Sequence, residues 1–223
     1  MHRNVRKHAQ AHAETITRDR RQRLAVEAAR LMAEGGMRDF HQAKLKAAER
    51  LGIYDDASLP RNREIEDALR EYQRLFQPGH AAGLRQRRKA ALHALEFFRL
   101  FDPRLVGAVL DGTADAHSAV CLHLYSDDPD AVPRCLDEHG IPAEVRSRRL
   151  RLDREREDDF PVWLFSADGL SFDITVLPLD MLRHAPLSGI DEKPMKRASI
   201  AQLLLLLAVD EFAGHEAVAA PQP

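Results

Sequence analysis

Three side chains that could ligate a metal ion fall in two short apolar segments of this 223-residue chain. Cys121 and His123 stand two residues apart in segment 119–125, and Asp173 stands in segment 170–177. Side chains two residues apart on a β-strand point to the same face of the sheet. We therefore predict that the two segments are neighbouring strands and that all three side chains share one face. Sulfur, imidazole and carboxylate together would suit a transition metal such as zinc, although packing residues of a half-buried strand follow the same pattern.

A glycine turn that could approach a phosphate group precedes these segments. The apolar run 105–110 has the pattern of a strand that ends in Asp111-Gly112-Thr113. Glycine has no side chain to block the approach of backbone N–H groups to a phosphate. The phosphate-binding candidates here are Gly112, Thr113 and Ser118, and the nearby carboxylates that could serve as catalytic groups are Asp111 and Asp115.

The order of these features resembles the signature of the nucleotidyltransferase superfamily. That signature is a strand ending in Gly-Ser or Gly-Thr, a next strand carrying Asp-x-Asp, and a third carboxylate on a later strand. The resemblance covers residues 84–177. It implies a domain in which three carboxylates hold two metal ions, which neutralise the phosphates of a nucleoside triphosphate during in-line transfer.

Two of the three implied carboxylates are missing from this chain. Ala119 and Cys121 stand where the resemblance places Asp-x-Asp, and Asp173 stands for the third carboxylate. One carboxylate does not hold two Mg²⁺ ions, because hard cations require several oxygen ligands. We therefore expect a catalytically degenerate nucleotidyltransferase-like protein that binds a nucleotide, a nucleic acid or a protein partner.

Two other functions stay open. An active nucleotidyl or adenylyl transferase would need rearranged ligands, with Mg²⁺ or Mn²⁺ as its cofactor, and these ligands would come from Asp111, Asp115, His123 and Asp173. A structural scaffold would use the domain only as a framework for protein contacts. Metal-dependent triphosphate binding distinguishes the transferase, and salt-sensitive nucleic-acid binding through residues 1–23 distinguishes a nucleic-acid binder from a scaffold.

The whole chain also resembles a group of proteobacterial proteins that share four short stretches. These stretches read Leu-Asp-Gly-Thr-Ala, Leu-His-Leu, Ala-Pro-Leu-Ser and Pro-Met-x-Arg-Ala, and they stand here at 110–114, 122–124, 185–188 and 194–198. The resemblance implies a bacterial protein and brings no particular activity with it.

Basic residues form three groups that could contact phosphate. Residues 1–100 carry 21 Lys and Arg against 13 Asp and Glu, and the remaining residues carry 12 against 22. This asymmetry favours either a basic arm for nucleic acid or docking of two oppositely charged halves. The nucleic-acid candidates are Arg18, Arg20, Arg21 and Arg23, and the nucleotide candidates near the last helix are Lys193, Lys196 and Arg197. Four more arginines, Arg146, Arg148, Arg149 and Arg151, precede the acidic run 155–159, and we expect them to pair with it.

Helical spacing of apolar residues fills the first hundred residues, and strand spacing follows. We predict helices at 24–34, 40–51, 62–77 and 84–100, strands at 105–110, 119–125, 145–152, 161–165 and 170–177, a helix before Gly140, and a last helix at 200–212. Asp168-Gly169 has the composition of a hairpin turn, and Ser199 with Gln202 that of a helix capping box. The fold class is therefore α+β: an N-terminal helical region followed by a nucleotidyltransferase-like mixed β-sheet with flanking helices.

Composition changes divide the chain into four expected parts. These are a flexible basic arm at 1–23, a helical region at 24–101, the nucleotidyltransferase-like domain at 102–213 and a tail at 214–223. No apolar run approaches the roughly 18 residues that a membrane span needs, so we expect no membrane partner. The sequence shows no secretory signal, and its two cysteines lack metal-ligand spacing. Both features favour a reducing, cytoplasmic location.

Overall fold

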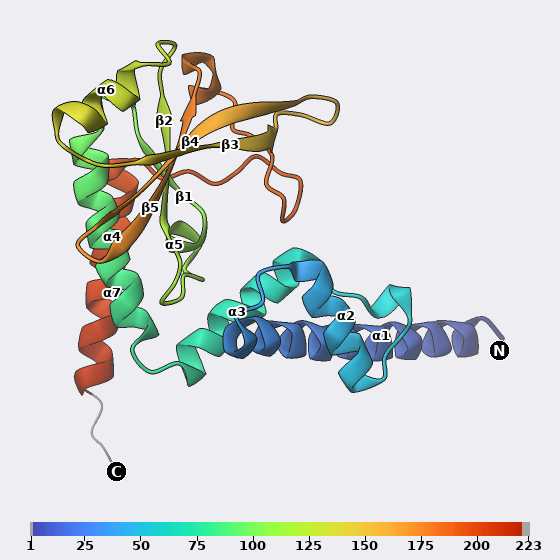
Figure 1. Ribbon diagram of the computed structural model, residues 1–223. Helices are drawn as coiled ribbons and strands as arrows, with labels where there is room; N and C mark the ends of the chain where they lie inside the picture. The colour runs from blue at the N-terminus through green and yellow to red at the C-terminus, as the bar shows by residue number, and fades with distance from the viewer. Residues whose placement is uncertain (1, 220–223) are drawn as a thin grey trace. The chain divides into compact units, whose positions relative to one another are not determined.

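A computed structural model of the chain describes the backbone of residues 2–219 and the side chains of residues 12–211 (Figure 1). The chain forms two compact units, Met1–Pro78 and Gly79–Pro223. The sequence placed a domain boundary at residues 101–102, which is one helix later than the division between these two units. The helix that follows Gly79 buries Ala91, Leu95 and Phe98 in the core of the second unit, which is why it belongs there.

The first unit is helical. Its elements are α1 (His2–Gly35), α2 (Phe40–Leu51), the short helix η1 (Asp56–Ser58) and α3 (Asn62–Phe76). Apolar side chains of α1 pack against α2 and α3, and Leu24, Ala28 and Ile65 are fully buried there. Gly52 ends α2 in the left-handed conformation, as its position after the apolar pattern predicted.

The sequence predicted a flexible arm at residues 1–23, and the structure continues α1 through this stretch back to His2. Arg20 pairs with Asp55 at 3.2 Å, and Arg21 donates a hydrogen bond to the carbonyl oxygen of Ala57 at 2.5 Å. Polar contacts to the loop after α2 therefore hold a stretch of helix that has few apolar residues to bury. The expected tail at 214–223 likewise begins as helix, and its last four residues lie outside the described range.

The second unit contains a five-stranded sheet with the strand order β1-β2-β5-β4-β3. Strands β2 and β5 are parallel neighbours, and the other neighbouring pairs are antiparallel. This mixed sheet with flanking helices confirms the expected α+β class. In chain order the elements are α4 (His80–Phe97), η2 (Arg99–Phe101), β1 (Arg104–Val106), α5 (Ala108–Asp111), β2 (Val120–Tyr125), α6 (Ala131–Glu138), β3 (Glu144–Arg151), β4 (Glu157–Ala167), β5 (Leu170–Leu177), η3 (Leu179–Leu182) and α7 (Ile200–Ala219).

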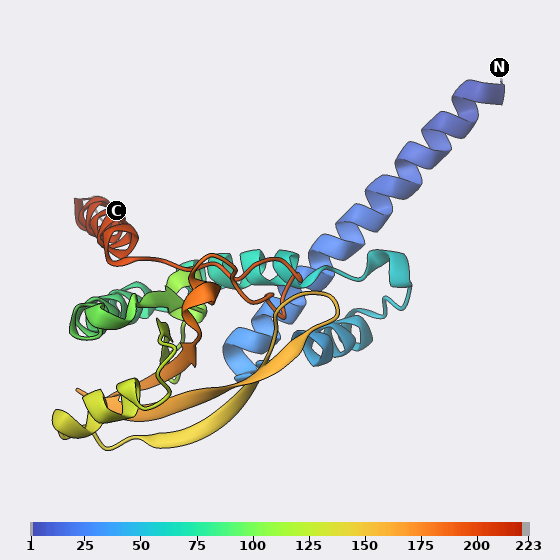
Figure 2. The ribbon, with the colours of Figure 1, turned by 90° about the horizontal axis from the view of Figure 1, so that it is seen from above.

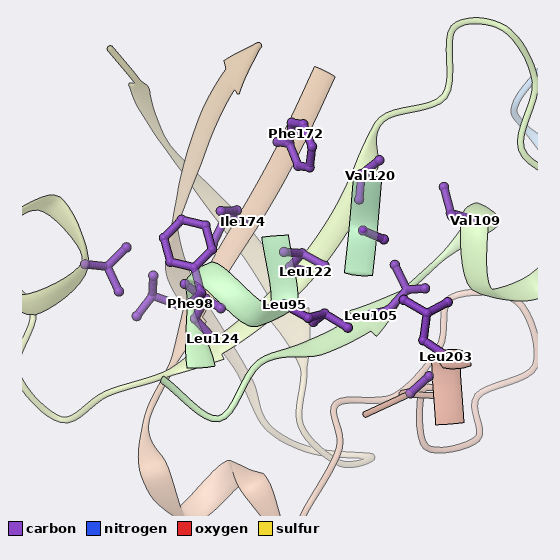
Figure 3. Close-up of a cluster of buried hydrophobic side chains, with 14 of the residues drawn as sticks. Leu95, Phe98, Leu105, Val109, Val120, Leu122, Leu124, Phe172, Ile174 and Leu203 are labelled. Atoms are coloured by element: carbon purple, nitrogen blue, oxygen red, sulfur yellow. The ribbon is translucent and has the colours of Figure 1, made fainter. Parts of the chain in front are cut away.

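One face of this sheet is covered by helices, and we call it the helix face. Side chains of β2 and β5 that point to it, Leu122 and Ile174 among them, are fully buried against α4, α6 and α7. Figures 1 and 2 show α4 and α7 running alongside each other over this face, and Figure 3 shows the side chains that converge between them and the strands. Arg88 of α4 joins the two helices through a hydrogen-bonded ion pair with Asp210 at 2.8 Å.

Two local predictions from the sequence are confirmed. Asp168 and Gly169 both have positive φ, at 51° and 74°, and they connect β4 to β5 as the two central residues of a hairpin turn. Before α7, the Ser199 N–H donates to Oε1 of Gln202 at 2.8 Å, and the Gln202 N–H donates back to Oγ of Ser199 at 3.4 Å. This reciprocal pair is a capping box.

The prediction of a continuous strand at residues 105–110 is wrong. The structure shows only three strand residues in β1, and then a single helical turn, α5. Gly107 lies between them at φ 71° and ψ −155°, a backbone conformation that residues with a side chain avoid. The chain leaves the sheet at this glycine. A run of six apolar residues fits a short strand and a buried helical turn equally well, so the pattern could not distinguish them.

A segment that we call the strap, residues 178–199, links the two outer strands of the sheet. Near its middle, Leu187 donates a backbone hydrogen bond to the carbonyl oxygen of Arg151 in β3 at 2.7 Å. Near its end, Ala198 exchanges two backbone hydrogen bonds with Leu105 in β1 at 2.8 and 2.9 Å. Among the residues described, none of the helices is long and apolar enough to cross a membrane.

Candidate functional site

The three side chains that the sequence singled out lie on the face of the sheet opposite the helices, which we call the polar face. In the parallel pair β2–β5, Cys121 lies beside Asp173, and His123 lies beside Thr175. Alternation along each strand turns the intervening Leu122 and Ile174 to the helix face. The prediction that Asp173 lies on a strand next to Cys121 and His123, with its side chain on their face, is confirmed.

Asp173 is engaged by an arginine that reaches it from β3. Nη1 and Nη2 of Arg148 donate to the two carboxylate oxygens of Asp173 at 2.9 and 2.6 Å. Nη1 also donates to Oγ1 of Thr175 at 3.2 Å. The Asp173 side chain is 14% exposed and that of Arg148 is 41% exposed. Hydrogen bonding to the carboxylate raises the pKa of Arg148 above its ordinary value.

This pairing corrects the expectation that all four β3 arginines would pair with the acidic run 155–159. Arg149 and Arg151 do so, with Asp159 at 2.7 Å and with Glu157 at 3.9 Å. Arg148 does not, because strand alternation turns its side chain to the other face. Arg146 pairs with Glu144 of its own strand at 2.8 Å.

His123 is a buried histidine with an unsatisfied ring nitrogen. Its side chain is 2% exposed, and its Nδ1 has no hydrogen-bond partner. Burial, together with the positive charges of Arg197 and Arg148, lowers the pKa of His123 from 6.5 to about 4, against an opposing effect of Asp173. The imidazole is therefore neutral at pH 7 and lies in a positively charged environment.

The polar face carries three guanidinium groups, which we call the arginine cluster: Arg104, Arg148 and Arg197. Arg104 lies directly beside His123 in the β1–β2 register. Arg197 extends from the strap and donates to the Tyr125 hydroxyl at 2.7 Å and to the Met181 carbonyl oxygen at 2.8 Å. Burial raises the pKa of Tyr125, while Arg197 and Arg104 act to lower it. Around His123 the positive charges of Arg197 and Arg148 oppose the negative charge of Asp173, and together with burial they keep its pKa low.

The expected metal site does not form a ligand set in the structure. Cys121, His123 and Asp173 share a face, yet the described residues contain no group of three or more His, Cys, Asp and Glu side chains that could hold a metal ion. The same holds for the alternative carboxylates. Asp111 forms an ion pair with Lys196 at 3.0 Å, and Asp115 accepts hydrogen bonds from the His117 N–H and the Ser118 hydroxyl at 2.8 Å each.

The glycine turn is present, but its amides are already used. Gly112 adopts the left-handed conformation, and the N–H groups of Gly112 and Thr113 both donate to the carbonyl oxygen of Ala108, at 2.9 and 3.0 Å. Ser118 exchanges hydrogen bonds with Asp115. The turn therefore ends α5 and does not present the free N–H groups that a phosphate site requires.

The remaining basic candidates divide between exposed and engaged side chains. Arg18 and Arg23 are exposed on α1, whereas Arg20 and Arg21 are bound to the loop after α2. Lys193 is exposed in the strap. Of the three basic candidates before α7, Arg197 is the one whose contacts place it on the polar face.

Sequence reasoning missed two buried arginines in α4. Arg87 donates to the carbonyl oxygens of Ala116 and Ser118 at 2.5 and 3.2 Å, and Arg88 donates to that of Val109 at 3.1 Å. These contacts fix α5 and the loop before β2 against the helix. The sequence pattern could have indicated the burial of Arg88, because Arg88 follows Leu84 at helical spacing on the apolar side of α4.

Comparisons with known proteins add no relative from which a role could be taken. No protein-family profile matches the chain, and searches of curated proteins and of solved structures find no match either.

Proposed function

We propose that the second unit is a nucleotidyltransferase-like domain that does not catalyse metal-dependent transfer and instead binds a phosphate-bearing anion, such as a nucleotide, without a metal ion. The observation that carries the proposal is the contact between Arg148 and Asp173. Both oxygens of that carboxylate accept from one guanidinium group. A cation that is part of the chain thus stands where the superfamily resemblance would place a metal ion.

The charge balance supports an anionic ligand. The polar face carries three guanidinium groups and a neutral imidazole: Arg148 binds the Asp173 carboxylate, Arg197 donates to the Tyr125 hydroxyl, and Arg104 donates to the Pro103 carbonyl oxygen. Guanidinium groups bind phosphate through paired N–H donors and stay charged at every physiological pH. The Arg148 side chain is 41% exposed, which leaves part of the group open to solvent and to a ligand.

Binding of nucleotides in the presence of EDTA tests the proposal. We expect ATP or GTP to bind more tightly than the corresponding nucleoside, and Mg²⁺ to leave the affinity unchanged, because the protein supplies the positive charge. Calorimetric titration with the triphosphate, the nucleoside and inorganic phosphate measures this. Equal affinity for the phosphate-free nucleoside, or binding that requires Mg²⁺, contradicts the proposal.

Variants of neighbouring arginines locate the binding site. The double substitution Arg148→Gln with Asp173→Asn removes both charges of the pair and should weaken phosphate-dependent binding by about tenfold or more. Arg149→Gln is the matched control, since Arg149 stands next in β3 but pairs with Asp159. Equal losses in both variants would show that the effect is general electrostatics and not a site on the polar face.

The active transferase is tested separately. Incubation with each of four labelled nucleoside triphosphates and Mg²⁺ or Mn²⁺ should give no transfer to the protein or to a cell extract, because the described residues hold no metal-ligand group. Transfer that disappears in a folded Asp173→Ala variant would overturn the proposal in favour of an enzyme with rearranged ligands.

A further inference from the structure

Residues 2–23 of helix α1 form a strongly basic stretch, which we call the basic helix. Its described residues 12–16 are all exposed, and the buried core of the first unit starts at Leu24. Figure 2 shows this part of α1 extending past α2 and α3. At 1.5 Å per residue the basic helix is about 33 Å long. It carries two acidic residues against seven basic ones: Arg3, Arg6, Lys7, Arg18, Arg20, Arg21 and Arg23.

Two arginines of the basic helix are exposed and unpaired. Glu14 stands four residues before Arg18, and Asp19 stands four residues before Arg23, which is the spacing of a helical ion pair. Neither pair forms, and no other described side chain bonds to Arg18 or Arg23. Unlike the two arginines between them, which contact the loop after α2, these cations are free to bind an anionic partner.

The basic helix lacks the apolar side that a helical or a lipid partner would need. Apart from alanine, its apolar residues are Val5 and Ile16. Helices that pair with one another, and helices that lie on membranes, present apolar side chains at steps of three and four residues. A partner of the basic helix must therefore be held by charge and hydrogen bonds.

We propose that the basic helix binds duplex DNA by lying in the major groove. An α-helix with its side chains is about 10–12 Å wide, and the major groove of B-form DNA is about 12 Å wide. Arg18 and Arg23 are five residues apart, so their Cα–Cβ bonds point about 140° apart around the helix. They can thus reach phosphates of the two strands that border the groove. The major groove of duplex RNA is deep and narrow, which makes B-form DNA the better fit.

The first two turns of α1 continue the positive charge. Arg3, Arg6 and Lys7 stand in the same helical backbone ahead of Arg18. Duplex DNA carries one negative charge per about 1.7 Å of its axis, so a basic helix of this length faces many phosphates. Phosphate contacts carry no sequence information. The binding is therefore strongly salt-dependent and tolerant of DNA sequence.

The basic helix is separate from the proposed anion site, because the two share no residue and belong to different units. The double substitution Arg18→Gln with Arg23→Gln should weaken DNA binding and leave nucleotide binding unchanged. Arg148→Gln with Asp173→Asn should do the reverse. Each proposal can therefore fail without the other. DNA binding that depends on Arg148 and not on Arg18 and Arg23 overturns the assignment to the basic helix.

Fluorescence anisotropy of a short labelled DNA duplex, between about 50 and 200 mM salt, tests the proposal. Arg18→Gln with Arg23→Gln should weaken binding about tenfold or more and reduce the slope of log affinity against log salt by about two. The matched control is Lys46→Gln with Lys89→Gln, since both lysines are exposed and lie outside α1. The control should keep the wild-type affinity and slope.

Four results of that titration overturn the proposal. These are no binding at the lowest salt, an equal loss in the lysine control, tighter binding to duplex RNA, and tighter binding to phosphatidylserine vesicles. Circular dichroism confirms that each variant is folded.

Dimethyl sulfate footprinting and a helix-breaking variant test the geometry. The reagent methylates N7 of guanine in the major groove and N3 of adenine in the minor groove, and we expect protection of N7. Ala13→Pro keeps every charge but breaks the helix ahead of Arg18, so it should weaken binding, whereas Ala13→Gln at the same exposed position should not. Protection of adenine N3 alone, or full affinity in Ala13→Pro, overturns the proposal.

Discussion

The pair formed by Arg148 and Asp173 is the central residue-scale feature of the polar face. Strand β4 lies between β3 and β5, so the Arg148 side chain must cross one whole strand to reach its partner. Two strand spacings amount to about 10 Å, which the arginine and aspartate side chains cover together. A lysine in place of Arg148 would offer no paired donors to the two carboxylate oxygens. The pair therefore ties three strands together by one side chain.

Loss of both partners should cost less than the two single losses added together. Arg148→Met leaves the largely buried Asp173 carboxylate without its cation, and we expect it to lower the free energy of unfolding by about 1–2 kcal/mol. Arg148→Met combined with Asp173→Leu should be less destabilising than the sum of the single substitutions. Urea unfolding of the four proteins in a double-mutant cycle measures the coupling, and additive effects would show that the pair contributes no interaction energy.

His123 should make stability depend on pH. Its pKa is lowered to about 4 in the folded chain, so the unfolded chain binds a proton near pH 6.5 while the folded chain does not. Stability from this group is complete above pH 6.5 and is lost as the pH falls towards 4, by on the order of 3 kcal/mol. Urea unfolding between pH 4 and 7 should therefore show a smaller slope in His123→Gln than in the wild-type protein. The exposed His93→Gln serves as the control and should keep the wild-type slope.

The sequence predicted the shared face of Cys121, His123 and Asp173 because the period of two along a strand is a local property. The sequence alone could not identify Arg148 as the partner of Asp173. Arg148 lies 25 residues earlier, and the choice between Asp173 and the nearby acidic run depends on strand order, which no local pattern contains. The unsatisfied Nδ1 of His123 likewise follows from what the strap and β1 place around it.

At the scale of elements, Gly107 decides where β1 ends. A side chain at its φ of 71° would be strained by the backbone conformation alone, since a Cβ atom would lie at an ordinary contact distance of 3.7 Å from that of Cys121. Gly107→Ala should lower the stability of the second unit by about 1–3 kcal/mol. Gly189→Ala, at a position with open space and no positive φ, should be close to neutral. Thermal unfolding compares the two, and equal melting temperatures would contradict the assigned strain.

Elements whose own residues carry the full pattern, including the residues that end them, were predicted well. Strand β5 matches the expected 170–177, and α2 matches the expected 40–51 with its terminal glycine. The predictions failed where the structure of a segment depends on more than its local pattern. Helix α1 extends far beyond its apolar pattern, and of its described side chains in this stretch, Arg20 and Arg21 are the ones seen to contact the loop after α2. The run 105–110 divides at a glycine whose φ the sequence does not reveal.

At the scale of the whole molecule, the position of α4 predicts which fragment folds. Residues 79–223 expressed alone should unfold cooperatively, because the core of this unit lies within them. A fragment of residues 102–223 lacks the buried Ala91, Leu95 and Phe98 and leaves Asp210 without Arg88, so it should not form a stable fold. Denaturant unfolding of both fragments checks this, and a cooperative transition in the shorter one would restore the boundary expected from the sequence.

The strap has a consequence for self-association of the sheet. Outer strands offer unpaired backbone groups to which a strand of another molecule can add. Here one segment occupies part of both outer strands, Leu105 of β1 through Ala198 and Arg151 of β3 through Leu187. A single protease cut engineered after Gly189 would leave Leu187 near a free chain end, while Ala198 stays buried in the core beside β1. We expect the cut protein to expose the β3 edge and to form fibrils that bind thioflavin T, while the intact protein does not, so that one short loop protects the chain against amyloid-like growth from that side.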